Sequence, residues 1–245
     1  MPEFTEWKPV PKPAEIAENR LIHAILEGRF PIHSPLPGER QLADLLGVTR
    51  PTLREALQRL ARDGWVDIQQ GKSTRVRDYW QEGNLGVLAA LARYPEQLPL
   101  DFVPNLLQVR SLLAPAYTRL AVEHRPQSVA SFCEQEANLA ETAAAFAAYD
   151  WQLHSLLTHL SGNPVFTLIL NGFRELYPLM GARYFALPPA RRYSRHYYQT
   201  LGQHAANHET EAAEALTKQV MVSSIDFWQK AYSSTSSPAE GQALL

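Results

Sequence analysis

The stretch LPGERQLADLLGVTRPTLREALQRLARDGWVDIQQGKSTRV, residues 36–76, decides the fold of the first part of this chain. Within it, the leucines of residues 39–46 follow the i, i+3, i+4 spacing of a helix face, and Gly47 is typical of a helix C-terminus. A second helix is predicted after Thr49, a residue type that caps helix N-termini, and it ends at Gly64. Two helices joined by a short turn containing glycine form a helix-turn-helix. The side chains expected to be buried are Leu42, Leu45, Leu46, Leu53, Ala56, Leu57 and Leu60.

The segments on either side of this motif predict a winged helix. Upstream, residues 14–27 repeat apolar side chains at helical spacing before Gly28. Downstream, WVDIQ alternates apolar and polar residues, QGKS is a glycine turn, and TRVRDY resumes with β-branched residues, which together predict a hairpin. A hairpin directly after the second helix of a helix-turn-helix is a wing. The face expected in the upstream helix comprises Ile16, Arg20, Ile22 or His23, and Leu26.

The rest of the chain has helical periodicity broken by Pro and Gly, and no strand pattern. We therefore predict a mainly α protein, with an N-terminal winged helix-turn-helix followed by an all-helical ligand-binding bundle. The expected helical stretches are 84–93, 99–123, 127–147, 149–160, 164–185, 189–203 and 207–232. The expected organisation is a flexible tail at 1–13, a DNA-binding domain at 14–80, a linker helix at 81–98, a helical effector domain at 99–232 and a disordered tail at 233–245.

Length and composition narrow the class of protein. The 245 residues suit two domains, and 45% hydrophobic with 20% charged residues is ordinary for a globular chain. There is no run of the roughly 18 to 20 apolar residues that a membrane span requires, and the acidic, proline-rich start is unlike a secretory signal. The single cysteine, Cys133, is interpreted as a small helix residue. We expect a cytoplasmic protein with no membrane partner.

The charge is unevenly distributed along the chain. The formal net charge is −2, but residues 40–77 hold eight Lys or Arg against four Asp or Glu, a net of +4. Residues 81–245 hold eleven against fourteen, a net of −3. A small basic module followed by a neutral or acidic body is typical of a DNA-binding domain joined to a regulatory domain.

The basic residues of the helix-turn-helix are in positions that suit DNA recognition. Residues in the first turn of the second helix reach base edges in this motif, and an arginine guanidinium can bond guanine at two atoms. Threonine hydroxyls and helix N-terminal amides suit phosphate oxygens. The alternative is a solvated helix face whose arginines pair with Glu55 and Asp63. The candidate DNA contacts are Arg40, Thr49, Arg50, Thr52, Arg54, Gly71 and Lys72.

Residues 36–76 resemble the GntR superfamily of bacterial transcription regulators. The likeness is greatest to the FadR branch, which regulates fatty acid metabolism, and it continues through LARYPEQ, NLLQVR and SGNPVFTLILNGFRELYPLMGARYF, over roughly residues 14–232. This resemblance implies a homodimer that binds a palindromic double-stranded DNA operator, as a repressor or activator. It also implies that long-chain acyl-CoA, bound in the helical domain, releases the DNA. Pro51 and Gln70 stand where the branch has threonine and histidine, at two of the implied DNA contacts.

The same resemblance implies a set of ligand-binding residues in the helical half. Their apolar and aromatic side chains suit a long acyl chain, and an arginine with several hydrogen-bonding groups suits the polar end. Met221, Ser223 and Ser233 replace a glycine, a glutamate and a lysine of the branch, so the CoA headgroup is less firmly implied than the chain. Core aromatics at helical spacing are the competing interpretation. The implied ligand contacts are Leu107, Arg110, Asn171, Tyr177, Tyr184, Ser224 and Trp228.

Two alternatives differ in function class. A related branch of GntR regulators captures small carboxylates through a metal held by an aspartate and three histidines, and Asp150 and His154, four residues apart, are weak candidates for such ligands. His204 and His208 form another such pair, but the set is incomplete, and no metal or other cofactor is expected. An enzyme is not expected, because GxSxG, P-loop, GxGxxG and HExxH motifs are absent from the sequence.

Overall fold

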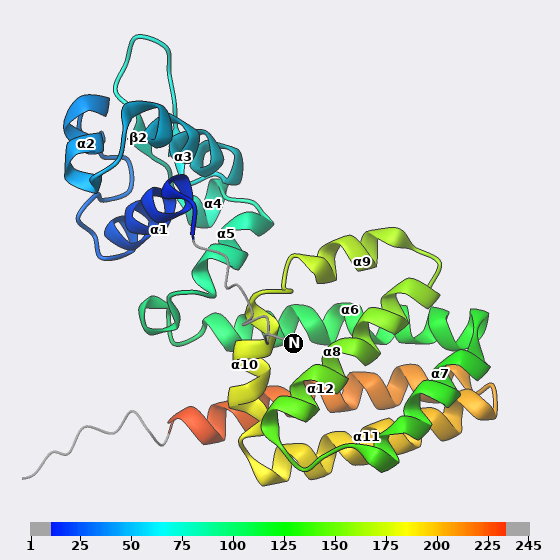
Figure 1. Ribbon diagram of the computed structural model, residues 1–245. Helices are drawn as coiled ribbons and strands as arrows, with labels where there is room; N and C mark the ends of the chain where they lie inside the picture. The colour runs from blue at the N-terminus through cyan, green and yellow to red at the C-terminus, as the bar shows by residue number, and fades with distance from the viewer. Residues whose placement is uncertain (1–10, 234–245) are drawn as a thin grey trace, which may run out of the picture. The chain divides into compact units, whose positions relative to one another are not determined.

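The computed structural model describes residues 11–233, and the chain divides after Gln97 into two compact units. Residues 1–10 and 234–245 lie outside the described residues, so the tails predicted there stay predictions. Each unit is described by itself (Figure 1).

The first unit is a winged helix-turn-helix, as predicted. Helix α3 packs against both α1 and α2, and two short antiparallel strands follow it. The N-cap of α3 is Thr49, and Gly64 follows its last residue, as expected. Its elements are α1 (Pro13–Leu26), α2 (Glu39–Leu46), α3 (Arg50–Asp63), β1 (Val66–Asp67), β2 (Arg75–Val76), α4 (Tyr79–Glu82) and α5 (Leu85–Leu91).

The predicted core of α3 is confirmed, but those of α1 and α2 are corrected in part. All four predicted side chains of α3 are buried, whereas Leu45 of α2 is 65% exposed, because this short helix turns only its Leu42, Ala43 and Leu46 edge inward. In α1 the expected face is right at Ile22, which is buried, but wrong at Ile16 and Arg20, which are exposed. Arg20 donates to the Leu46 carbonyl at 2.7 Å. The buried residues of α1 are Ala14, Ala17, Leu21, Ile22 and Ile25.

The wing is a minimal hairpin. Val66 pairs with Val76 and Asp67 with Arg75, so each strand is only two residues long. At its tip the Lys72 amide donates to the Gln69 carbonyl at 3.2 Å, closing a turn in which Gly71 has φ +74°. That conformation favours glycine, which leaves the tip narrow and free of a side chain at this position.

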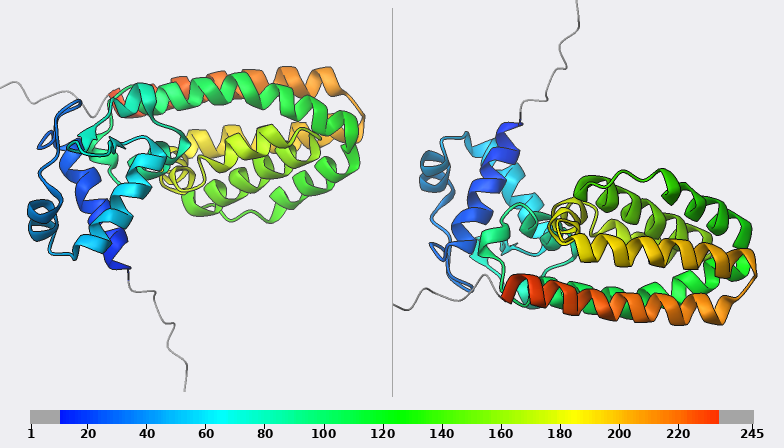
Figure 2. Two further views of the ribbon diagram at one scale, coloured as in Figure 1. Left: turned by 90° about the horizontal axis from the view of Figure 1, so that it is seen from above. Right: turned by 90° about the horizontal axis from the view of Figure 1, so that it is seen from below.

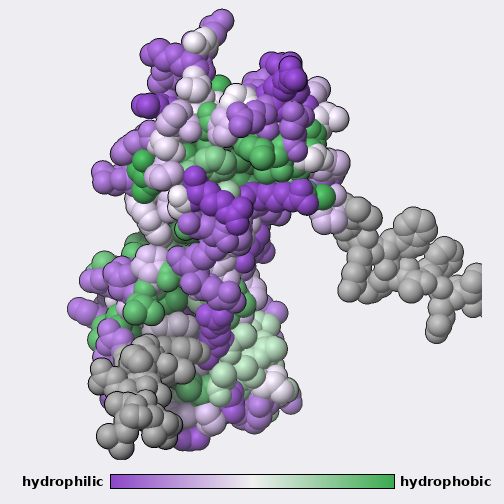
Figure 3. Space-filling view, turned by 90° about the vertical axis from the view of Figure 1, so that its left-hand side faces the viewer, coloured by the Kyte–Doolittle hydropathy of each residue, from purple (hydrophilic) through white to green (hydrophobic). Residues whose placement is uncertain are grey.

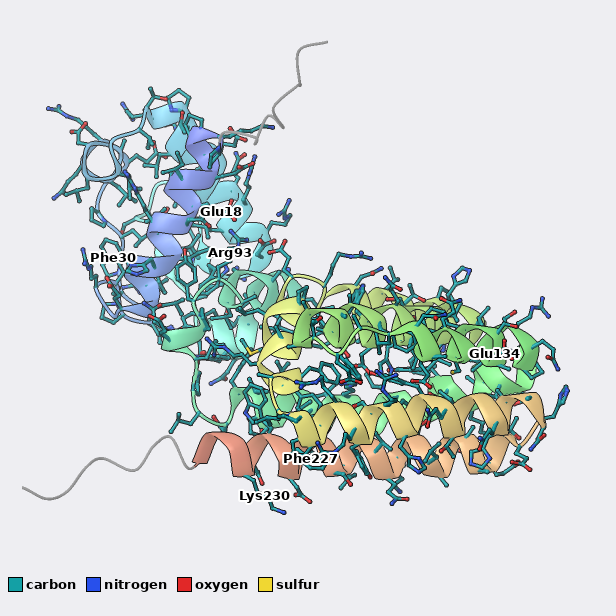
Figure 4. The ribbon with its side chains drawn as sticks, turned by 60° about the horizontal axis from the view of Figure 1, so that its bottom comes forward. Glu18, Phe30, Arg93, Glu134, Phe227 and Lys230 are labelled. Carbon is teal, nitrogen blue, oxygen red and sulfur yellow. The ribbon has the colours of Figure 1, made fainter. Side chains whose placement is uncertain are left out.

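Residues after the wing fold back onto α1. The Arg93 Nη1 group donates to the Asn19 side chain at 2.6 Å, and the Tyr94 hydroxyl donates to the Asn19 carbonyl at 2.8 Å. Figure 4 shows Arg93 and Glu18 on neighbouring segments of this unit. Burial raises the pKa of Glu18, against the opposing charges of Arg93 and Arg59. These contacts attach α5 to the winged helix.

The second unit is an all-helical bundle whose long helices run side by side (Figure 2). Helix α6 packs along α12, α8 packs against α6 and α10, and α11 packs against α7 and α12. Side chains fill the space between these helices (Figure 4). The helices are α6 (Phe102–His124), α7 (Pro126–Cys133), α8 (Ala143–Leu160), α9 (Pro164–Asn171), α10 (Leu176–Phe185), α11 (Pro188–Ala206) and α12 (Thr210–Ser233), with a 3-10 turn at Glu134–Asn138. Another 3-10 turn, Pro95–Gln97, ends the first unit.

Two of the predicted helical stretches, 127–147 and 164–185, are each interrupted in the structure. The stretch 127–147 ends early, because Arg195 on α11 binds the carbonyls of Glu136 and Leu139 and draws that segment out of the helix. Helix α8 then runs without a break through the expected boundary at 148. The stretch 164–185 is two helices, because residues 172–174 tighten into i→i−3 hydrogen bonds.

No helix among residues 11–233 combines the length and the apolar character that crossing a membrane would need.

We predict that Gly64→Ala destabilises the first unit by about 2–4 kcal/mol, because the residue has φ +97° and an added Cβ would lie 2.7 Å from the Gly83 Cα atom. Gly28→Ala is the matched control, since its φ is +75° but nothing lies within 4 Å of the added atom. It should cost only about 1 kcal/mol. Urea unfolding followed by circular dichroism measures both, and equal costs would show that the close approach is not what requires glycine.

Candidate DNA-contact face and ligand pocket

The N-terminus of α3 is held in a fixed shape by two threonines. The Thr49 hydroxyl accepts from the Thr52 amide at 3.4 Å, and the two hydroxyls lie 2.8 Å apart. This is an N-cap, and it orients the exposed first turn of α3. Arg50 occupies the first helical position, and Pro51 follows where its missing N–H group costs nothing.

The arginines of α2 and α3 gather at one junction. Arg50 and Arg54 both approach the Glu39 carboxylate, with Arg54 at 2.8 Å and Arg50 at 3.6 Å. Arg40 and Arg50 also line one shallow hollow between α2 and α3, together with Leu45. We name the group Glu39, Arg40, Arg50 and Arg54 the arginine junction. All three arginines are exposed, so they are accessible to a partner molecule.

The alternative interpretation was a solvated helix face whose arginines pair with Glu55 and Asp63. In the structure these two acidic residues have other partners. Glu55 pairs with Arg59 at 2.7 Å, and Asp63 pairs with Arg62 at 3.0 Å, so neither neutralises Arg50 or Arg54. Figure 3 shows hydrophilic side chains projecting from the face of the first unit on which α2 lies. Of the seven candidate DNA contacts, five lie at this junction or its helix cap, and the exposed Gly71 and Lys72 form the wing tip.

The second unit contains an apolar pocket between α6, α9, α10 and α12. Its cavity volume is about 110 Å³, and about 940 Å³ is not filled by protein atoms when the space open to solvent is included. Most of its wall is aliphatic or aromatic, and the polar groups are few. The lining residues are Val103, Leu106, Leu107, Val109, Arg110, Leu113, Tyr117, Phe166, Ile169, Leu170, Phe173, Leu176, Tyr177, Met180, Gly181, Tyr184, Phe185, Ser224 and Trp228.

Six of the seven implied ligand contacts line this pocket. Residues from α6, α10 and α12, far apart in the sequence, meet there, as the resemblance implied. Asn171 is the exception, because it is exposed at the end of α9 and accepts from Arg174 at 2.7 Å. Ser224 donates to the Met221 carbonyl of its own helix at 2.6 Å, so its proton is already bonded.

A buried polar network adjoins the pocket. Arg110 donates through Nη2 to Asp150 Oδ2 at 2.6 Å and to His154 Nε2 at 2.5 Å. Asp150 also accepts from the hydroxyls of Tyr177 and Tyr198, the latter at 2.8 Å. Asp150 and His154 are almost completely buried, at 2% and 0% exposure. Arg110 and Tyr177 belong to both the network and the pocket wall.

The network fixes the protonation states of its members. Because Arg110 can only donate, His154 Nε2 must accept, and the neutral ring then carries its proton on Nδ1 and donates to the Tyr117 hydroxyl at 2.7 Å. Burial, together with the charge of Arg110, lowers the pKa of His154 to about 3. Burial acts to raise the pKa of Asp150, but Arg110, His154 and the two tyrosines hold it below its ordinary value. The network therefore consists of the ion pair between Arg110 and Asp150, surrounded by neutral histidine and tyrosine side chains.

The lone pairs that a metal would need at Asp150 and His154 are already used. The Arg110 guanidinium bonds both residues, which places a fixed cation beside the two weak metal candidates. The second histidine pair does not complete such a site, because His204 Nδ1 bonds Glu209 Oε2 at 2.6 Å. Among the described residues, no group of three or more His, Cys, Asp or Glu side chains could hold an ion.

Sequence reasoning missed the other members of the network. Tyr117 lies seven residues after Arg110, two turns along the same face of α6, and this spacing was an available signal. Tyr198 comes from α11 and carried no local signal, since only the packing of α11 against the bundle brings it to Asp150. The α9 side chains that line the pocket also carried no signal of their own, because their apolar spacing is the same as that of core residues.

Comparisons with known proteins agree with both units. Residues 13–76 match the gntR family of bacterial regulatory proteins, and residues 77–237 match the FadR C-terminal domain family. The second match covers well over half of the chain, and curated relatives match across both units. The chain belongs to the FadR branch of the GntR family. It is therefore a DNA-binding transcription regulator and not an enzyme, as predicted.

Relatives in this branch are similar along most of their length. A fatty acid metabolism regulator protein of Shewanella amazonensis is 41% identical, over 89% of this chain and 91% of its own. One of Pectobacterium atrosepticum is 42% identical, over 85% and 84%. The solved structure of Lar, which controls the expression of the Listeria monocytogenes agr system, has a TM-score of 0.61 at 14% identity, covering 91% of this chain and 99% of that one. The last similarity concerns the fold alone.

We predict that the free energy of unfolding of this FadR-branch protein falls by about 2 kcal/mol between pH 7 and pH 5, because of His154. Its pKa is about 3 when folded, against the ordinary histidine value of 6.5, so only the unfolded chain takes up this proton in that range. The folded state therefore loses stability as the pH falls through 6.5, at up to about 1.4 kcal/mol per pH unit.

Urea unfolding at several pH values measures this slope, with His154→Gln as the comparison. Glutamine can still accept from Arg110 and donate to Tyr117, but it does not titrate. The variant is expected to be less stable at pH 7 and to have a shallower slope. Equal slopes in the two proteins would mean that His154 is not the titrating group.

Proposed function

We propose that this regulator binds its operator through the arginine junction and the wing, and that a long-chain acyl-CoA in the pocket of the second unit weakens this binding. The observation that carries the proposal is the pocket, which combines a long apolar wall with a small, neutral polar network. The operator would be a palindrome bound by a homodimer, in the cytoplasm. Relatives named as fatty acid metabolism regulators support the same ligand class.

The apolar wall suits a hydrocarbon chain. Its aliphatic and aromatic side chains come from four helices, and each buried CH₂ group of a ligand gains about 0.8 kcal/mol from leaving water. A chain of many CH₂ groups therefore supplies affinity that a small carboxylate cannot obtain here. The long chain, and not the headgroup, would provide most of the binding free energy.

The polar network suits a neutral carbonyl better than a carboxylate. Arg110 and Asp150 cancel each other's charge, so a carboxylate in the pocket would bring an unbalanced negative charge into a desolvated site. Two donors beside the pocket could bond an oxygen atom, but both are buried, so a ligand would reach them only after neighbouring side chains shift. The buried Arg110 Nε group has no hydrogen-bond partner in the described part of the chain, and the Tyr117 hydroxyl accepts from His154 and keeps its own proton. A thioester carbonyl needs donors and no counter-charge.

Release of DNA requires that the ligand distinguish two states of the protein. A ligand with equal affinity for the DNA-binding and the released states would shift nothing, however tightly it bound. The acyl-CoA must therefore prefer the released state. The predicted linker, residues 81–98, belongs almost wholly to the first unit, which ends at Gln97, so a change in the helical unit would reach the winged helix through the end of this segment.

We predict that oleoyl-CoA binds with a Kd below about 100 μM, worth at least roughly 5.5 kcal/mol, and weakens operator binding by at least about 10-fold at saturation. Free oleate should bind more weakly, because its carboxylate would bring an unbalanced negative charge into the pocket. Isothermal titration measures the ligand, and fluorescence anisotropy measures DNA affinity on a duplex selected by the wild-type protein from a random pool. An operator affinity that saturating oleoyl-CoA leaves unchanged would refute the effector role.

Leu107→Glu and Leu112→Glu form a matched pair for this experiment. Both lie on α6, but Leu107 lines the pocket, whereas Leu112 is 71% exposed and outside it. Only the first should raise the Kd for oleoyl-CoA, by at least about 10-fold, because it places a charge against the acyl chain. Neither should alter DNA affinity without ligand.

We predict different effects for the two kinds of cation in the first unit. Arg50→Ala should cost about 1–3 kcal/mol on the selected duplex and weaken its preference over a shuffled duplex, as expected of a base contact. Lys72→Ala should weaken binding to both duplexes alike and reduce the salt slope by about 1, as expected of a phosphate contact. If Arg50→Ala kept full selectivity, the base-reading role would be wrong.

A further inference from the structure

An acidic side chain stands at the centre of the proposed DNA-contact face. Glu39 is the first residue of α2 and is half-buried, yet it lies among the cations Arg40, Arg50 and Arg54. Asp44 lines the same hollow but has no ion pair with these arginines in the structure. A carboxylate repels phosphate, so at this position it reduces the attraction for any DNA. Its position in the first turn of α2 and its exposed ion pairs each contribute only up to about 1 kcal/mol to folding stability.

The carboxylate contacts the two arginines of α3 unequally. Arg54 donates to Glu39 Oε2 through Nε and approaches the same oxygen through Nη2, both at 2.8 Å. Arg50 reaches that oxygen only at 3.6 Å, which is longer than a hydrogen bond. One edge of the Arg54 guanidinium is therefore occupied, and all five donors of Arg50 stay available.

We propose that Glu39 is a positioning residue that assigns different roles to the two arginines and lowers the affinity for non-specific DNA. With its Nε edge held, Arg54 is fixed in place and offers only its Nη1–Nη2 end. Arg50, attracted by the same charge but not bonded to it, keeps both of its two-donor edges and can adjust to reach a guanine. Without the carboxylate, two like charges one helical turn apart would repel each other and adopt many rotamers.

This inference rests on the proposed DNA-contact role of the junction and adds a determinant of specificity to it. Specificity is a difference between two affinities, and a repulsive group can raise it by weakening the wrong complex more than the right one. On the operator, removal of the carboxylate would strengthen the phosphate attraction but weaken the base contact of Arg50, which would lose its positioning. On other sequences there is no base contact to lose, so only the attraction would increase.

The test is Glu39→Gln, which keeps the length of the side chain and removes its charge. Anisotropy titrations with the selected duplex and with a shuffled duplex of the same composition, at several salt concentrations, give both affinities. We expect the variant to bind the shuffled duplex about 3- to 10-fold more tightly, the effect of one charge near the phosphates. Its selectivity ratio should fall by a similar factor, because the selected duplex gains little.

Two controls separate positioning from a general change of charge. Glu55→Gln makes the same change on α3, where the carboxylate pairs with Arg59 outside the junction, and should leave the ratio within about 2-fold of wild type. In an Arg54→Ala background, Glu39→Gln should lose most of its effect on the ratio, since that effect acts through Arg54. Thermal unfolding of each variant shows whether folding is intact.

The outcomes are distinguishable. A lower ratio in Glu39→Gln alone, abolished by Arg54→Ala, supports the assignment. Equal tightening on both duplexes, or the same ratio change in Glu55→Gln, overturns it in favour of a simple charge effect. If the wild-type protein selects no duplex from the pool, the proposed DNA-contact face itself fails, and this result is different from a selective wild type whose ratio Glu39→Gln leaves unchanged.

Discussion

The buried ion pair between Arg110 and Asp150 is the interaction on which the helical unit depends. Two charges removed from water need further hydrogen bonds, and here Tyr177, Tyr198 and His154 supply them, although the Arg110 Nε group has no partner among the described residues. These five residues come from α6, α8, α10 and α11, so one carboxylate and one guanidinium fix the relative positions of four helices. Because the same arginine forms part of the pocket wall, the polar end of the pocket is held as rigidly as the core.

A different constraint shapes the winged helix. Helix α3 buries an entirely apolar face of Leu53, Ala56, Leu57 and Leu60, and this burial alone sets the rotation of the helix about its axis. Arg50 and Arg54 then lie on the exposed flank beside this face, where both approach Glu39 of α2. The core of this unit therefore determines which side chains a partner meets, and the N-cap at Thr49 determines where the exposed turn begins.

The sequence predicted the first unit well and the second only in outline. Local signals decided α3, namely its capping threonine, its apolar period and the glycine that follows. In the bundle, the break at residues 134–142 depends on Arg195, which is more than fifty residues away, so no local pattern could reveal it. The same holds for the pocket: the resemblance implied six of its residues, but Tyr198 reaches Asp150 only through the packing of α11. The prediction that Leu45 is buried was wrong for a local reason. In a helix of two turns, a regular apolar spacing does not ensure that every apolar side chain has a neighbour to pack against.

Helix α9 has an unusual property for an apolar segment. None of its residues is fully buried, although Phe166, Ile169 and Leu170 face the pocket. Their inner surfaces line the pocket, where the ring of Phe166 lies 5.7 Å from that of Tyr117, measured between centroids. Under the proposed function, an acyl chain in the pocket would add dispersion contacts to this wall. Binding of the ligand would then also stabilise α9, so the packing of this helix would respond to the occupancy of the pocket.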